Sequence, residues 1–160
     1  MKTLFSIFLF VSFFNLPTIS EIRKAYPSAA NSEKSAITFS SKFTIIAEED
    51  KVLLAYKGAS VTIVAKFKKK VSEKISTFKE GAKLIELAVA AEPNDIEIRL
   101  IRLSIQENTP GIVKYKKNIP DDKAFILKYY KDQSLALKEY IKSFVSQSKS
   151  FSEQEKQSLK

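Results

Sequence analysis

The stretch VSEKISTFKEGAKLIELAVAAEP, residues 71–93, decides the fold of this chain. Its apolar side chains recur at intervals of three and four residues: Val71, Ile75, Phe78, Ala82, Ile85 and Val89. This spacing puts them on one face of an α-helix. Because a residue that precedes proline disfavours the helical conformation, we expect the helix to end at Glu92, before Pro93. The stretch therefore predicts one long amphipathic helix.

The sequence before this stretch has the same helical spacing. Apolar residues again recur every three or four positions: Val52, Tyr56, Ala59, Ile63 and Phe67. Residues 60–65 could alternatively form a strand. We favour a helix because the apolar positions span four helical turns, and strands are rarely that long.

The sequence after Pro93 predicts a helix that is packed on two sides. Apolar residues follow two flanks, one with Ile96, Leu100 and Leu103 and the other with Ile98, Ile101 and Ile105. The remaining polar stripe is narrow and consists mainly of Arg99, Arg102 and Gln106. A helix that is apolar on two flanks is expected at the centre of the fold.

Further helix starts are indicated by capping residues. Ser32, Asn94 with Glu97, Pro120 with Asp121 and Asp122, Asp132 or Ser134, and Ser152 with Glu155 all have the spacing typical of helix N-termini. No segment alternates with period two, and the chain contains only 3 Gly and 5 Pro. We therefore predict an all-α fold of seven or eight helices, stacked as antiparallel pairs in a repeat array or an irregular bundle.

The N-terminus has the features of a signal peptide. Lys2 precedes an apolar run from Leu4 to Phe14, and Pro17 follows before small residues that suit cleavage after Ser20. A retained anchor is the competing interpretation, but a membrane span needs about 20 apolar residues. We expect residues 1–20 to be removed, and residues 21–160 to form a single all-helical domain in the periplasm or outside the cell.

The composition excludes several classes of chemistry. There is no His and no Cys, so imidazole bases, thiolate nucleophiles, disulfides and the usual zinc ligands are missing. We expect no metal and no cofactor; an enzyme that uses Lys, Tyr or a carboxylate is the least favoured alternative. The chain has 27 Lys plus Arg against 18 Asp plus Glu, a net charge of +9, and loss of the first 20 residues leaves +8.

Residues 52–106 resemble a helical hairpin of the tetratricopeptide repeat family. The resemblance rests on Gly81, Ile85 and Ala88 followed by the Glu92-Pro93-Asn94 exit, and on Gly58 as a small residue where two helices cross closely. It implies stacked antiparallel helix pairs and a protein-binding function.

Our principal candidate site combines the polar stripe with the segment that follows it. Arg99, Arg102 and Gln106 share one helical face, and Asn108, Tyr115, Lys116 and Lys117 lie in or near the next loop. Arginines of this kind bind carboxylates or phosphates bidentately, which suits a protein or peptide partner in the cell envelope. The alternative is that the arginines pair internally with acids such as Glu86 or Asp95.

Two basic clusters indicate a second function. Lys66 and Lys68–Lys70 form one cluster, and Lys114, Lys116 and Lys117 form the other. They could contact anionic lipid or an envelope polymer, or simply lie at helix ends, where cations are favoured. Export argues against nucleic acid as a partner.

Overall fold

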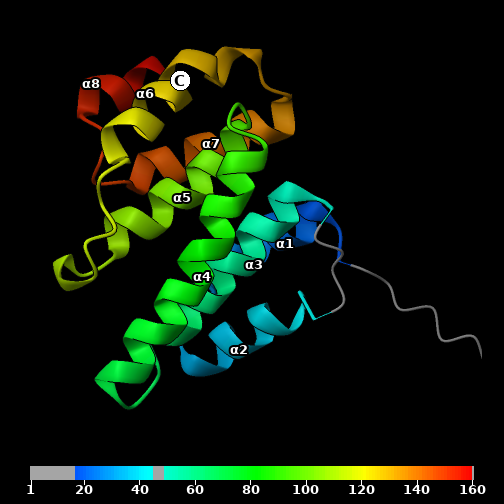
Figure 1. The fold of residues 1–160 in the computed structure, drawn as a ribbon. Helices are drawn as coiled ribbons and strands as arrows, with labels where there is room; N and C mark the ends of the chain where they lie inside the picture. Colours follow the sequence, from blue (N-terminus) through cyan, green and yellow to red (C-terminus); the bar gives the residue numbers. More distant parts are fainter. Residues whose placement is uncertain (1–16, 45–48, 160) are drawn as a thin grey trace, which may run out of the picture.

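The computed structural model describes residues 17–44 and 49–159, and over these ranges the protein is all-helical. Eight α-helices and three short 3-10 helices connect without any strand in the described residues (Figure 1). They are α1 (Ile19–Ala25), η1 (Tyr26–Ser28), α2 (Glu33–Ser41), α3 (Lys51–Ala65), α4 (Val71–Ala91), α5 (Ile96–Asn108), η2 (Gly111–Val113), α6 (Ile119–Tyr129), η3 (Tyr130–Asp132), α7 (Leu135–Gln147) and α8 (Glu153–Ser158). The predicted all-α class is confirmed, and residues 60–65 are helical.

The antiparallel pair α3 and α4 crosses with its backbones in contact (Figure 1). A Cβ atom added to Gly58 would lie 2.6 Å from the Gly81 carbonyl oxygen, and one added to Gly81 would lie 2.5 Å from the Gly58 carbonyl oxygen. Two facing glycines therefore allow an approach that any side chain would prevent. The expectation that Gly58 marks a close helix crossing is confirmed.

We expect Gly58→Ala to destabilise the protein by about 1–3 kcal/mol, because the added methyl group meets backbone atoms that cannot move aside. The penalty exceeds the ~1 kcal/mol that alanine gains over glycine in a helix. Gly111→Ala is the matched control, since a Cβ there meets nothing within 4 Å. Thermal unfolding checks the prediction, and equal melting temperatures for the two variants would refute it.

Helix α5 lies between two apolar cores, as its sequence predicts. One flank, with Ile98, Ile101 and Ile105, packs against α1–α4; the other, with Ile96, Leu100 and Leu103, packs against α6–α8. The polar face of α5 is also covered, because Arg102 is 5% and Gln106 0% exposed. The central position of α5 is confirmed, but its polar stripe does not face solvent.

Most predicted helix starts are correct, and one is wrong. Ser32 and Ser134 accept backbone hydrogen bonds as N-caps, and Ser152 forms a capping box with Glu155. Asn94 is not the cap of α5; Asp95 takes that place and accepts from the Ile98 N–H at 2.9 Å. The expected partner of the Asn94 cap, Glu97, is instead buried in the core, where an arginine binds it.

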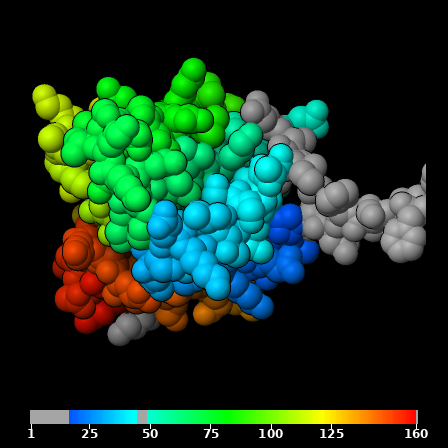
Figure 2. Space-filling model, turned by 90° about the horizontal axis from the view of Figure 1, so that it is seen from below, coloured from blue at the N-terminus to red at the C-terminus, as the bar shows by residue number. Residues whose placement is uncertain are grey.

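The N-terminal end of the described chain is part of the fold. Thr18 caps α1 and forms a capping box with Glu21, so the expected cleavage point after Ser20 falls inside this helix. The apolar run from Leu4 to Phe14 lies outside the described residues. In the described part of the chain, every helix is too short or too polar to cross a membrane. Figure 2 shows α2 on the surface, and it packs beside α3.

Candidate functional site

The two arginines of the predicted stripe bind a buried carboxylate. Arg102 donates to Asp122 through Nε at 2.7 Å and Nη2 at 2.6 Å, and Arg99 Nη1 donates to Asp122 Oδ1 at 3.0 Å. Asp122 is 0% exposed, and it comes from the first turn of α6. The carboxylate that we assigned to the helix dipole alone therefore also joins α6 to α5.

A second carboxylate extends this network to the loop after α5. Glu86 of α4 accepts from Arg102 Nη1 at 3.0 Å and from the Tyr115 hydroxyl at 2.7 Å. Burial disfavours the charged guanidinium of Arg102, but Asp122 and Glu86 more than offset this and raise its pKa. Burial, together with the hydrogen bond to Glu86, raises the pKa of Tyr115. The two arginines are thus occupied internally, with Asp122 and Glu86 as partners rather than Asp95.

The other residues of the candidate site are not brought together. Gln106 is fully buried; its Nε2 lies 3.4 Å from Asn118 Oδ1, and its Oε1 has no partner among the described residues. Lys116 and Lys117 are exposed on the loop. Asn108 is exposed and donates to the Ser104 carbonyl at 2.9 Å.

We expect Arg102→Met to destabilise the protein by about 3–5 kcal/mol, because it leaves the buried Asp122 carboxylate with Arg99 as its remaining cationic partner. Combining it with Asp122→Leu should recover part of the loss, since the fully buried carboxylate is then removed. Urea unfolding measures both effects. Lys117→Met, on the exposed loop, should change stability by less than about 0.5 kcal/mol. A loss of partner binding in Arg102→Met at unchanged stability would instead restore the predicted site.

A second buried polar cluster, absent from our sequence predictions, centres on Glu97. Arg23 of α1 binds it bidentately at 2.8 and 2.6 Å, and the Tyr56 hydroxyl of α3 donates to it at 2.8 Å. Tyr140 of α7 lies 3.0 Å from Tyr56, hydroxyl to hydroxyl. Burial raises the pKa of Tyr56 and of Tyr140 far above the ordinary value. The cluster thus ties α1, α3 and α7 to the central helix.

These tyrosines predict a loss of stability at alkaline pH. Below about pH 10 these tyrosines are neutral in both the folded and the unfolded state. Above about pH 10 the unfolded chain loses protons that the folded chain retains, so the free energy of unfolding falls. Each such tyrosine contributes about 1.4 kcal/mol per pH unit. Urea midpoints between pH 9 and about 11 should fall less steeply in Tyr56→Phe than in the unchanged protein. The two proteins contain the same lysines, so parallel curves would disprove the assignment to Tyr56.

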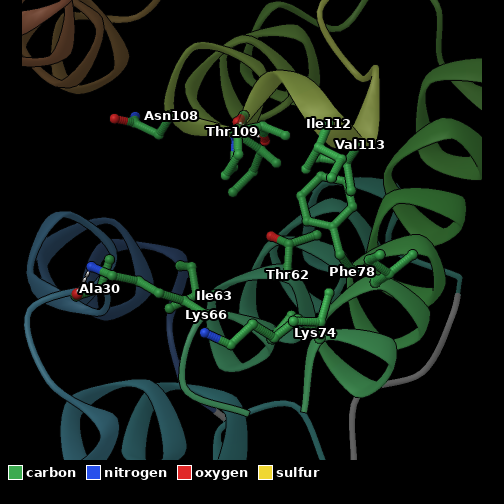
Figure 3. A pocket seen from close by; sticks show the side chains of 15 residues that line it. Ala30, Thr62, Ile63, Lys66, Lys74, Phe78, Asn108, Thr109, Ile112 and Val113 are labelled. Atoms are coloured by element: carbon green, nitrogen blue, oxygen red, sulfur yellow. Dashed lines mark hydrogen bonds between the residues drawn. The ribbon is translucent and has the colours of Figure 1, made fainter. Parts of the chain in front are cut away.

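A groove of about 460 Å³ lies on the loop side of the α3–α4 crossing (Figure 3). We call it the groove. The C-terminal half of α3 and the N-terminal half of α4 form two of its walls, and residues 105–113 form the third. Its apolar surface comes from Ile63, Ala65, Val71, Ile75, Phe78, Ile105, Pro110, Ile112 and Val113.

The uncharged polar residues of the groove direct their donors to their own helices. Thr62 donates to the Ala59 carbonyl at 2.7 Å, and Thr109 donates to the Ile105 carbonyl at 2.6 Å. Asn108, the one residue of the predicted site that lines the groove, binds the carbonyl of Ser104. The walls therefore present carbon atoms and few free hydrogen-bonding groups.

Two lysines supply the charge of the groove, and no acidic residue lines it. Lys66 and Lys74 come from either side of the α3–α4 turn. The Lys66 ammonium donates to the Ala30 carbonyl at 3.0 Å and lies 5.4 Å from the centre of the Phe67 ring. The Lys74 ammonium has no ion pair or hydrogen bond with any described residue, and its backbone N–H donates to the Lys70 carbonyl.

The buried network supports one wall of the groove. The Tyr115 ring meets Phe78 edge to face, with centroids 5.6 Å apart, while its hydroxyl is held by Glu86. The chain turns at Lys114, which lies between Val113 of the groove and Tyr115 and has a φ of 51°, in the left-handed region. Residues that we expected to bind a partner thus position the segment that lines the groove. The sequence patterns did not predict this groove. Its lining includes two apolar residues, Val71 and Ile112, that are 66% and 77% exposed in the structure.

No protein-family profile, no curated protein and no solved structure matches this chain. The resemblance to a tetratricopeptide hairpin therefore stays a prediction. In the described residues, no group of three or more acidic side chains has the geometry to hold a metal ion. The function has to be argued from the groove itself.

Proposed function

We propose that this protein is an exported binding module without catalytic activity, and that the groove holds the apolar part of its partner. One observation carries the proposal: a hollow of about 460 Å³ is walled almost entirely by apolar side chains and opens to solvent. Ligand sites in proteins have volumes of about 300–1,000 Å³ and the same character, apolar with a few polar groups. The proposal moves the binding face from the Arg99–Arg102 stripe to the groove beside it.

A protein of the cell envelope is one partner that suits this site. An amphipathic helix would lay its apolar side into the groove and leave its polar side in water. The groove lies between packed helices, as such recognition requires. Asn108 and the segment after it, which we selected from the sequence, belong to the wall that the partner would touch.

An anionic lipid is a second candidate, and the charge of this face favours it. Lys66 and Lys74 line the groove, and Lys68, Lys69 and Lys70 are exposed on the adjoining turn. Val71 is exposed beside them. Basic residues next to exposed apolar side chains are typical of proteins that contact anionic membranes.

A neutral apolar dye tests the proposed function without regard to charge. We expect N-phenyl-1-naphthylamine to bind and to increase in fluorescence, and Ile75→Glu to weaken its binding at least tenfold, because a carboxylate would enter the apolar wall. Leu87→Glu is the matched control: Leu87 is also on α4, 49% exposed, and does not line the groove. If the unchanged protein did not bind the dye, or the two variants bound it equally, the proposal would be wrong.

A further inference from the structure

We propose that the ligand of the groove is a long-chain carboxylate, such as a fatty acid. Its carboxylate would lie at Lys66 and Lys74, and its acyl chain would run along the apolar walls toward Phe78 and Ile112. This inference rests on the proposed function and adds the chemical class of the ligand.

The charge of the groove is concentrated at one end. Lys66 and Lys74 lie on one side of the view in Figure 3, and Phe78, Ile112 and Val113 lie on the other. An amphiphile with a single anionic terminus has the same polarity. An amphipathic helix would leave its polar side in water and has no need of two cations at one end of the groove.

Three acidic side chains near the groove walls in sequence have partners elsewhere, and Glu80, two residues after Phe78, is exposed but does not line the groove. Glu73 pairs with Lys70 at 3.6 Å, and Glu86 belongs to the buried network. Glu107 accepts hydrogen bonds from Ser148 and Ser150 at 2.6 and 2.9 Å. No acidic residue lines the groove, so an incoming carboxylate would be the only negative group within it in the described structure.

Lys66 is already positioned for this contact. Its hydrogen bond to the Ala30 carbonyl fixes the ammonium at the edge of the groove, which Ala30 also lines. An ammonium group carries three N–H donors, so two remain for an anion. Lys74 adds a second cation from the facing helix. A charge-assisted pair of this kind orients a carboxylate even where solvent weakens it.

The apolar walls favour an acyl chain over an extended peptide. A peptide brings backbone N–H and C=O groups that lose their water on entering the groove. Thr62 and Thr109 cannot donate to them without breaking hydrogen bonds to their own helices, and Asn108 has a single N–H donor left. An acyl chain has no such groups and covers Val71 and Ile112, the two exposed apolar residues at the rim.

Displacement of N-phenyl-1-naphthylamine by octanoate, decanoate and dodecanoate tests the inference. We expect each added methylene to strengthen binding about fourfold, the equivalent of ~0.8 kcal/mol, until the groove is filled. Dodecanol and dodecyltrimethylammonium should bind at least tenfold more weakly than dodecanoate. Lys74→Met should reduce this preference for the carboxylate, with the affinity of each variant for the dye measured as the reference.

Three controls separate the possible outcomes. Lys69→Met, in the exposed turn outside the groove, should keep the preference, and Lys74→Arg should restore it. If the dye binds but dodecanoate and dodecanol compete equally, the ligand is not a carboxylate and only this inference fails. If an acidic amphipathic peptide displaces the dye and dodecanoate does not, the partner is a protein. If the dye does not bind, the proposed function fails as well.

Discussion

The backbone contact between Gly58 and Gly81 is the constraint on which the rest of the structure depends. It brings α3 and α4 together at one point, and a side chain at either position would separate them. On the turn side of this crossing, the two helices supply facing walls of the groove. The same contact packs Ile85 and Ala59 into the core beneath α5. Two residues without side chains thus set both the approach of α3 to α4 and the position of two walls of the groove.

Buried ion pairs determine how the other helices pack around the α3–α4 pair. Asp122 is held by Arg99 and Arg102, and Glu97 is held by Arg23 and Tyr56. Removing charges from water is costly, so such pairs contribute little net stability, but breaking one leaves an unpaired charge in the core. They therefore fix which helices meet. Arg99 and Arg102 hold α6 in position through Asp122. Arg102 also holds the loop beside the groove, because Glu86 binds both Arg102 and Tyr115.

Local patterns predicted the helices well and the contacts among them only in part. The apolar spacing of residues 71–89 and the two flanks of α5 were correct because a helix repeats every three to four residues. The capping serines were correct because a cap acts within one turn. Glu97 was misassigned since its real partner, Arg23, is 74 residues away. Glu86 was anticipated as a partner of the arginines, but Asp122 was interpreted from its own helix start alone.

The sequence by itself determined the all-helical class, the central place of α5 and the excess of lysine over acidic residues. These properties follow from neighbouring residues and from composition, which need no knowledge of distant contacts. Only the tertiary structure decided that Arg102 faces Asp122 instead of solvent, and that Lys66, Phe78 and Ile112 surround one groove. The groove exists where the end of α3, the start of α4 and the segment that ends α5 leave a space between them. The shape of the groove depends on how these segments pack, so no local sequence pattern predicts it.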